Sequence, residues 1–364
     1  MLVFRAAVLS VVKHDYVARG MASHPRFQLA VVADDPHMPD WVHERNQLFA
    51  DANGIPYLRD VECALRDFNV DLAIVSSEAE RHSDLTIRAA RAGKHVVQDK
   101  PFATRRADAE RIVAEIEKAG VRFLMWNRNF LPAVLHAQEL LGKVGRIRAV
   151  HIDFYFAKDA GPPKGSRMPG YPPLNWHAHQ IAAHIDGSDG GVGVAPIGEL
   201  SNEGIYPLAY LRMLTDAPVE RVFARSASHF HQLYVDNGVE DLATMTLELQ
   251  GGIVATIALG RIGAASHPSG GDMKIRIVGD DGALVIGESR PEVGVYYRNQ
   301  PPKEARQRRV ASDNDFLQAD AFAHAIDTGG STILDAPASL AIFATIDAAL
   351  ESCRSGQVVQ MRRP

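Results

Sequence analysis

Cysteine is almost absent from this sequence of 364 residues, which contains only Cys63 and Cys353. Two cysteines cannot build a disulfide framework or a cysteine-rich metal site, so we expect both to be small buried residues. A large excess of either charge is also lacking, because 39 Lys and Arg residues stand against 44 Asp and Glu residues. Without a basic surface, nucleic acid is not expected as a partner.

A long uninterrupted apolar run at the start of the chain is lacking too. Residues 1–12 are mostly apolar, but Arg5 interrupts them, and they have neither the basic flank nor the small-residue cleavage site of a signal peptide. The run is also much shorter than the ~20 residues that span a bilayer. We therefore expect a cytoplasmic protein without membrane association.

The first third of the chain alternates short apolar runs with helical patterns, which is typical of a parallel sheet covered on both faces. The runs are Ala6–Leu9, Phe27–Ala33, Asp71–Val75, Lys94–Asp99 and Val121–Trp126. Strand–helix–strand alternation at this spacing implies right-handed crossovers. We therefore predict an α/β Rossmann domain with a doubly wound parallel sheet over residues 1–125.

From about Arg146 the apolar residues recur at every second position, as in strands with one covered face. The alternating segments are Val150–Phe156, Ala243–Gln250, Ile253–Leu259, Lys274–Val278 and Ala283–Ile286. Helices expected near Ser201–Leu214, Asp315–Asp327 and Pro337–Ser352 would cover one face. Residues 126–364 are therefore predicted to form an α+β domain for substrate binding and oligomerisation. Its sheet is large, open and mainly antiparallel, and its C-terminal helix is able to pack back on the Rossmann domain.

In a doubly wound sheet the ligand crevice lies beyond the carboxyl ends of the strands. Asp34 directly follows the second apolar run, where a carboxylate can accept hydrogen bonds from an adenosine ribose. Its charge would repel a 2′-phosphate, so we expect NAD rather than NADP as the cofactor. The alternative is an aspartate that caps a helix or a turn.

Glycine is missing where a dinucleotide-binding fold depends on it most. The G-x-G-x-x-G fingerprint lets backbone amides approach the pyrophosphate. Here the first loop reads Ser10-Val11-Val12-Lys13-His14. Either the pyrophosphate is bound less closely, with Ser10 and Lys13 substituting for the glycines, or the nucleotide site is weakened or lost.

Lys100 follows the fourth apolar run and directly precedes Pro101. Proline fixes its own φ and restricts the residue before it, so this lysine is held stiffly at the crevice. There it can orient a substrate hydroxyl and stabilise negative charge. The alternative is a solvated loop lysine.

The stretch from Gly93 to Ala103, GKHVVQDKPFA, resembles the G-K-H-V-x-x-E-K-P-x-A signature of the Gfo/Idh/MocA oxidoreductase family, with Asp99 in place of glutamate. This family includes glucose-fructose oxidoreductase, inositol dehydrogenases and dihydrodiol dehydrogenases. The resemblance extends over nearly the whole chain, including Trp126–Phe130. It implies that Lys100 lines the substrate site and that Asp99 helps to hold the cofactor.

The same resemblance implies further contacts with both ligands. The first loop, with Ser10, Val11 and Val12, and Asp34 are expected at the cofactor from their places after the first two apolar runs. The resemblance adds Ser76, Ser77 and His82, which fall where the family has T-P-N-x-x-x-H. Of these last three residues, Ser76 and Ser77 differ from the family. Arg128, within the stretch Trp126–Phe130, is implied as a substrate contact.

The family's second signature, approximately G-G-x-L-x-D-x-G-x-H, is similar to the segment Gly198–Leu208. Asn202 replaces the aspartate and Tyr206 replaces the histidine. Tyrosine at this place occurs in the glucose-fructose oxidoreductase and dihydrodiol dehydrogenase branches, which implies that Tyr206 is the acid/base. The loss of the aspartate charge departs from ordinary dehydrogenase chemistry. The alternative is a core tyrosine on an amphipathic helix.

The family does not explain a Gly/Pro-rich insertion over residues 160–193, which contains Trp176, His177 and His179. A loop this long is usually functional or mobile. Histidines two positions apart can bind zinc or contact the hydroxyls of a polyol. Because supporting cysteines and H-x-x-x-H spacing are both lacking, we expect these three residues to contact substrate and expect no metal.

The resulting hypothesis is an NAD-dependent dehydrogenase acting on a secondary alcohol or ketone of a sugar, sugar acid or cyclitol, as a homodimer or homotetramer. In this hypothesis Lys100 polarises the reacting oxygen and Tyr206 exchanges its proton. Asn202 orients one of these two side chains. Two alternatives stay open. One is a binding or regulatory homologue that has lost the cofactor, and the other is a lyase or hydrolase that recycles NAD without net NADH production.

Overall fold

The computed structural model describes residues 2–12, 14–127, 132–156, 198–230, 232–262, 271–287, 292–297, 304–306 and 314–361. The chain forms two compact units. The first contains residues 2–127 and Asp315–Phe343, and the second contains the other described residues. The helix α12 (Ala336–Ser355) therefore begins in the first unit and ends in the second.

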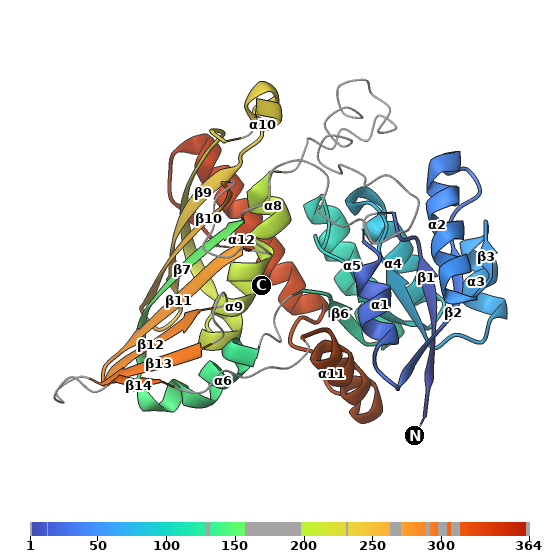
Figure 1. Ribbon diagram of the computed structural model, residues 1–364. Helices are drawn as coiled ribbons and strands as arrows, with labels where there is room; N and C mark the ends of the chain where they lie inside the picture. The colour runs from blue at the N-terminus through green and yellow to red at the C-terminus, as the bar shows by residue number, and fades with distance from the viewer. Residues whose placement is uncertain are drawn as a thin grey trace. The chain divides into compact units, whose positions relative to one another are not determined.

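The first unit is built on a six-stranded sheet whose neighbouring strands are all parallel (Figure 1). In spatial order the strands are β3 (Tyr57–Leu58), β2 (Phe27–Ala33), β1 (Phe4–Leu9), β4 (Leu72–Val75), β5 (His95–Gln98) and β6 (Phe123–Met125). The helices between them are α1 (Tyr16–Ala22), α2 (Asp40–Asn53), α3 (Val61–Asp67), the 3-10 turn η1 (Ala79–Arg81), α4 (His82–Arg91) and α5 (Arg106–Ala119). The strand order reverses between β1 and β4, so the predicted doubly wound sheet is confirmed.

The strands of this sheet are apolar because helices cover both of its faces. Every residue of β4 is buried, as are Ala6–Leu9 of β1. The helices α2 and α5 end at Gly54 and Gly120, whose φ angles of 64° and 67° glycine adopts without the clash of a side chain. The buried strands, and the helices that end at glycine, fix the position of the carboxyl edge of the sheet.

One predicted helix lies in a different place from the one expected. α11 (Asn314–Thr328) forms where the sequence predicts a helix, but it belongs to the first unit rather than covering the antiparallel sheet. Its Asp327 accepts two hydrogen bonds of 2.8 Å from Arg26. Gln318 accepts a hydrogen bond of 3.1 Å from the backbone N–H of Asn127. Hydrophobic periodicity shows that a helix has an apolar face but does not identify the surface that this face covers.

The described residues of the second unit form a nine-stranded sheet, in which β7 and β10 are the one parallel pair among them. In spatial order the strands are β14 (Glu304–Arg306), β13 (Glu292–Tyr297), β12 (Gly282–Gly287), β11 (Gly271–Gly279), β7 (Ile147–Phe156), β10 (Ile253–Arg261), β9 (Leu242–Leu249), β8 (Val219–Ala227) and β15 (Val359–Gln360). The predicted large and mainly antiparallel sheet is confirmed. In β7 the buried Ile152 and Phe154 alternate with the exposed His151 and Asp153, so one face is covered.

Helices pack on the covered face of this sheet (Figure 1). They are α6 (Pro132–Leu140), α8 (Glu199–Glu203) and α9 (Ile205–Thr215). The 3-10 turn η2 (Leu141–Lys143) follows α6, and the short α10 (Gln232–Asn237) follows β8. The single helix predicted over Ser201–Leu214 is in fact two, separated at Gly204. Pro207 has no backbone N–H to donate to the preceding turn, and a Cβ at Gly204 would lie 2.3 Å from the carbonyl oxygen of Leu200.

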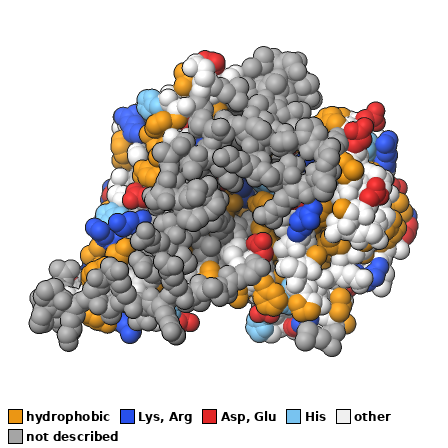
Figure 2. Space-filling model, viewed as in Figure 1, with side chains coloured by type: hydrophobic (Ala, Val, Ile, Leu, Met, Phe, Trp, Pro, Cys, Tyr) orange, Lys and Arg blue, Asp and Glu red, His pale blue; other side chains and the backbone are white. Residues whose placement is uncertain are grey.

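Three further features concern the exposure of the described residues. By length and composition alone α12 could cross a membrane, and half of its apolar window is buried inside the structure. Cys63 and Cys353 are only half-buried, so the expectation that both lie in the core is wrong. In the face shown in Figure 2, the described Lys and Arg side chains are scattered among acidic and apolar ones.

Candidate active site

Four of the predicted cofactor residues meet at the carboxyl edge of the parallel sheet. Ser10, Asp34, Ser76 and Asp99 directly follow β1, β2, β4 and β5, and these four strands are neighbours in the order β2-β1-β4-β5. All four residues are fully buried. The fold therefore collects two hydroxyls and two carboxylates at the place where doubly wound sheets bind their ligands.

Ser10 adopts the backbone conformation that a fingerprint glycine would supply. Its φ is +66°, in the left-handed region that residues with a side chain rarely occupy. Its hydroxyl and that of Ser76 are buried, and neither has a hydrogen-bond partner among the described residues. The two lie at adjacent strand ends, because Leu9 pairs with Val75. Buried hydroxyls of this kind are costly unless a ligand or water completes them.

The rest of the first loop is held by Asn46 of α2. The side-chain oxygen of Asn46 accepts a hydrogen bond of 2.8 Å from the backbone N–H of Val11, and its amide donates one of 2.8 Å to Asp34. The side chains of Val11 and Val12 are buried. Lys13, the second residue proposed to replace the glycines, lies outside the described residues.

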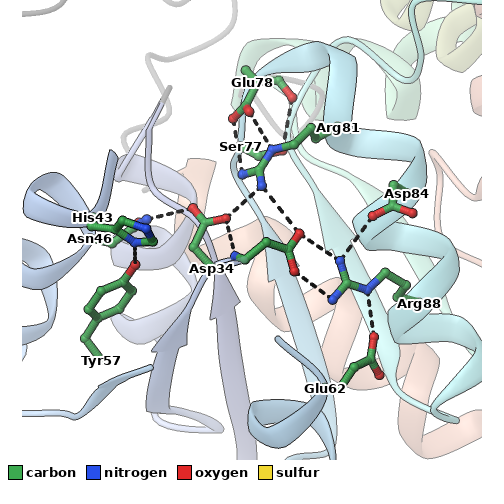
Figure 3. Close-up of polar contacts among 11 residues, drawn as sticks. Asp34, His43, Asn46, Tyr57, Glu62, Ser77, Glu78, Arg81, Asp84 and Arg88 are labelled. Atoms are coloured by element: carbon green, nitrogen blue, oxygen red, sulfur yellow. Dashed lines mark hydrogen bonds and ion pairs between the residues drawn. The ribbon is translucent and has the colours of Figure 1, made fainter. Parts of the chain in front are cut away.

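The Asp34 carboxylate is already well supplied with hydrogen bonds (Figure 3). Its Oδ1 accepts one of 2.8 Å from Arg81 Nη1 and one of 2.8 Å from the backbone N–H of Asp35. Arg81 also contacts Glu78 at 2.5 Å. Burial lowers the pKa of the Arg81 guanidinium, but the charges of Glu78 and Asp34 outweigh this effect, so that the pKa lies above its ordinary value. Asp34 thus forms the turn contact of the alternative interpretation as well as an ion pair.

A second ion pair lies beside the first one (Figure 3). Arg88 of α4 donates two hydrogen bonds of 2.9 Å to Asp35. Burial by itself would raise the pKa of Asp35. The hydrogen bond and the charge of Arg88 have the larger effect, so the pKa of Asp35 lies below its ordinary value. Glu62 and Asp84 complete the contacts of Arg88, at 2.7 and 3.2 Å.

Asp99 joins the first loop to the backbone of Lys100. Its Oδ2 lies 2.5 Å from Nδ1 of His14, and its Oδ1 accepts hydrogen bonds from the hydroxyl of Tyr16 at 3.2 Å and from the backbone N–H of Lys100 at 2.8 Å. Lys100 is buried and precedes a cis peptide bond to Pro101. One carboxylate therefore sets the position of both the loop and the lysine.

His82 and Ser77 form part of the scaffold of the turn after β4. The ring nitrogens of His82 lie 2.8 Å from the carbonyl oxygen of Pro101 and 3.0 Å from that of Ser77. The hydroxyl of Ser77 donates to the carbonyl oxygen of Glu78 at 3.0 Å. These contacts tie the turn after β4 to the segment that carries Lys100.

In the second unit, Asn202 and Tyr206 lie in α8 and α9. The amide of Asn202 donates a hydrogen bond of 3.0 Å to Glu203, which pairs with Arg261 at 3.3 Å. Tyr206 is buried, with its ring centroid 5.5 Å from that of Phe154. The remaining predicted substrate residues, Arg128, Trp176, His177 and His179, lie outside the described residues. Among the described residues, no group of three or more potential metal ligands is found.

Comparison with known proteins decides the family. Residues 12–127 match the family model described as "Oxidoreductase family, NAD-binding Rossmann fold", and residues 195–361 match the one described as "Oxidoreductase family, C-terminal alpha/beta domain". The chain belongs to the Gfo/Idh/MocA oxidoreductase family. The resemblance of its lysine signature is thereby confirmed, and the chain is an oxidoreductase with an NAD(P)-binding Rossmann domain.

Several known proteins are similar to this Gfo/Idh/MocA chain at low sequence identity. Myo-inositol 2-dehydrogenase of Thermotoga maritima is 26% identical over 251 residues, covering 68% of this chain and 66% of that protein. D-xylose 1-dehydrogenase (NADP(+)) 2 of Haloferax volcanii is 24% identical over 335 residues, covering 87% and 89%. The structure of levoglucosan dehydrogenase with NADH and L-sorbose shares the fold, with a TM-score of 0.79, 17% identity and full coverage of both chains.

The carboxyl edge fits the nucleotide that the family binds. The left-handed Ser10 keeps the course of a glycine loop, and the hydroxyls of Ser10 and Ser76 are buried without partners among the described residues. Asp34 stands at the end of β2, where the ribose of a dinucleotide is bound in this fold. The loop without glycine therefore keeps the backbone conformation of a glycine loop at Ser10.

Sequence reasoning missed three residues of this Gfo/Idh/MocA site: Asn46, Glu78 and Arg81. A signal existed for Asn46, because it lies on the face of α2 that also carries the buried Val42 and Phe49, so an amide interrupts an apolar stripe. Glu78 and Arg81 are three positions apart. An acidic and a basic residue at this spacing are common on solvated turns, so the spacing alone does not indicate a site.

Proposed function

We propose that this chain is an NAD-dependent dehydrogenase that moves a hydride between nicotinamide and a secondary alcohol or ketone of a sugar, sugar acid or cyclitol. The observation that carries this proposal is the shared sheet edge, where the carboxylate of Asp34 lies with Lys100 and the hydroxyls of Ser10 and Ser76. Neither hydroxyl has a hydrogen-bond partner among the described residues. The substrate class is supported by relatives named for myo-inositol and D-xylose, and by the neighbour crystallised with L-sorbose.

In this proposal each step at the substrate belongs to a residue of the chain. Bound NAD supplies the nicotinamide C4 as hydride acceptor. Lys100, held by Asp99, donates to the reacting oxygen and stabilises its negative charge. Tyr206 accepts the hydroxyl proton as the carbon loses its hydride, and Asn202 orients one of these two groups. Arg128, Trp176, His177 and His179 are the proposed contacts to the other hydroxyls.

The choice of NAD over NADP rests on charge. Asp34, Asp35 and Glu78 contribute three carboxylates beside the two guanidinium groups of Arg81 and Arg88. Glu62 and Asp84 add two more around Arg88. This excess of negative charge would repel a 2′-phosphate.

We further propose a cytoplasmic homodimer or homotetramer, without nucleic-acid or membrane partners. The exposed face of the nine-stranded sheet supports the oligomer, because it carries exposed apolar side chains such as Val254 among polar ones. A face of this kind suits a partner copy as well as water.

Calorimetric titration of the purified protein with NAD and NADP tests the cofactor, after any co-purified nucleotide has been assayed. We expect NAD to bind more tightly, and a screen of sugars and cyclitols to show net NADH production with one class. A well-folded, nucleotide-free sample that binds neither dinucleotide would favour the cofactor-deficient alternative. Turnover of a sugar derivative without net NADH would favour the recycling lyase or hydrolase.

A further inference from the structure

The guanidinium of Arg81 is held along two of its edges by carboxylates (Figure 3). Nη1 donates to Oδ1 of Asp34 at 2.8 Å, while Nε and Nη2 lie 2.5 and 3.4 Å from the two carboxylate oxygens of Glu78. Asp34 comes from the end of β2, and Arg81 from the 3-10 turn after β4. The pair therefore spans the end of β1, which lies between these two strands.

The charges in this cluster are poorly screened by solvent. The Asp34 side chain is fully buried, and those of Arg81 and Glu78 are 17% and 15% exposed. Burial raises the pKa of Glu78 above its ordinary value, although the charge of Arg81 opposes the shift. In such surroundings a single added or removed charge changes the binding of an anion far more than it would on an open surface.

The position of the cluster determines which part of a bound dinucleotide these charges would affect. In a doubly wound fold the adenosine ribose lies at the end of the second strand, so a 2′-phosphate would approach Asp34 and its neighbours. Asp34 and Arg81 alone would sum to zero charge and offer a guanidinium to that phosphate. Glu78 adds a second carboxyl group to Arg81, and Asp35 lies 3.6 Å from Nη1. The edges of the guanidinium that face Glu78 therefore already have an acceptor.

We propose that Glu78 and Arg81, rather than Asp34 alone, determine the preference for NAD: Glu78 occupies and neutralises Arg81, so that Arg81 cannot receive a 2′-phosphate. This inference rests on the proposed function. It makes Glu78 a positioning residue, acting through Arg81 on the ribose site. The opposite effects expected on removing each partner distinguish this role from a general loss of structure.

The test compares AMP with adenosine 2′,5′-bisphosphate, which differ by the 2′-phosphate alone, by calorimetric titration of the full-length protein. Glu78→Gln should lower the ratio of the bisphosphate to the AMP dissociation constant by about tenfold, because the freed guanidinium can donate to the phosphate. Arg81→Met should raise the same ratio, because Asp34 then lacks its counter-ion. Glu115→Gln is the matched control, since Glu115 forms a similar two-point pair with Arg91 on α4.

Unchanged ratios in both variants, with AMP binding intact, would overturn the inference. So would a Glu78→Gln ratio that moves no further than that of Glu115→Gln. Should Arg81→Met fail to fold in a thermal unfolding scan, the Glu78→Gln ratio alone decides the matter. A wild-type protein that binds neither AMP nor NAD contradicts the proposed function instead, so the two failures are separable.

Discussion

Ser10 combines a strained backbone with a buried hydroxyl, and both properties lower the stability of the folded chain. A residue with a Cβ in the left-handed region loses roughly 1–2 kcal/mol relative to glycine. The hydroxyl adds a desolvation cost, because it has no partner among the described residues. Retaining both suggests that the side chain serves a ligand, in line with its proposed contact to the cofactor.

Ser10→Gly should therefore separate stability from binding. We expect the free energy of unfolding in urea to rise by about 1 kcal/mol, because the strain and the buried hydroxyl are both removed. NAD affinity should fall at the same time, since a ligand contact is lost. Ser10→Ala serves as the control, because it removes the hydroxyl and keeps the strain. Tighter NAD binding by Ser10→Gly would contradict the proposed contact.

A second prediction concerns the charge of the Lys100 side chain. Lys100→Met keeps the length of the side chain and removes its charge, so kcat should fall roughly 100-fold or more while the protein stays folded. Lys94 offers a matched control: its Nζ donates to the carbonyl oxygen of Val70 at 2.8 Å, away from the sheet edge. Near-normal kcat in Lys100→Met, measured as NADH production, would refute the proposed role of this lysine.

At the scale of elements, the start of α8 depends on Glu240. The backbone N–H of Glu199 donates to its carbonyl oxygen at 3.1 Å, and that of Leu200 donates to its carboxylate at 3.3 Å. The carboxylate also lies directly over Gly198, where a Cβ would be 2.0 Å from its carbon atom. The helix that carries Asn202 thus begins on a partly buried carboxyl group.

This carboxyl group predicts how stability depends on pH. Burial, together with the charges of Glu199 and Asp241, raises the pKa of Glu240 from 4.5 to about 7. The unfolded chain ionises at the lower value, so the stabilising contribution is complete below pH 4.5 and is lost as the pH rises to about 7. The loss is on the order of 3 kcal/mol. Urea unfolding of Glu240→Gln should show a flatter pH profile than wild type or the exposed control Glu220→Gln. Parallel profiles would refute this assignment.

The elements also show what the sequence makes predictable. Strands β1, β2, β4 and β5 were predicted because strands buried on both faces consist of unbroken apolar runs. The strand β3 was missed, since two residues carry no periodicity, and the break at Gly204 was missed because apolar positions continue across it. The parallel pairing of β7 with β10 depends on register between distant segments, which no local pattern contains.

The candidate active site also has residues that the sequence predicts and residues that only the structure reveals. Ser10, Asp34 and Asp99 were found from their places at strand ends, which the order of the elements determines. Arg81 was missed because its partner Asp34 lies 47 positions away, and only the folded chain shows that the two meet. Topology thus predicts which strand ends carry the site, and side-chain pairing across the edge must come from the structure.

At the scale of the whole molecule, the nine-stranded sheet has one face covered by helices and one that is partly apolar. On the second face, Val254 is 44% exposed and pairs across the sheet with Ala149 and Glu248. Next along β10, Thr256 lies 2.7 Å from Nδ1 of His151. A surface of small, β-branched and paired polar side chains can be buried against a second copy at little desolvation cost.

Val254→Arg tests whether this face forms the proposed oligomer. An arginine at the centre of an interface between identical chains faces its own copy, so we expect the subunit dissociation constant, measured by sedimentation, to rise at least about tenfold. Val358→Arg is the control, because Val358 is 53% exposed but lies outside the strands of the sheet. If Val358→Arg dissociates the protein and Val254→Arg does not, the contact lies on another face. A wild-type protein that sediments as a monomer at every concentration would refute the oligomer itself.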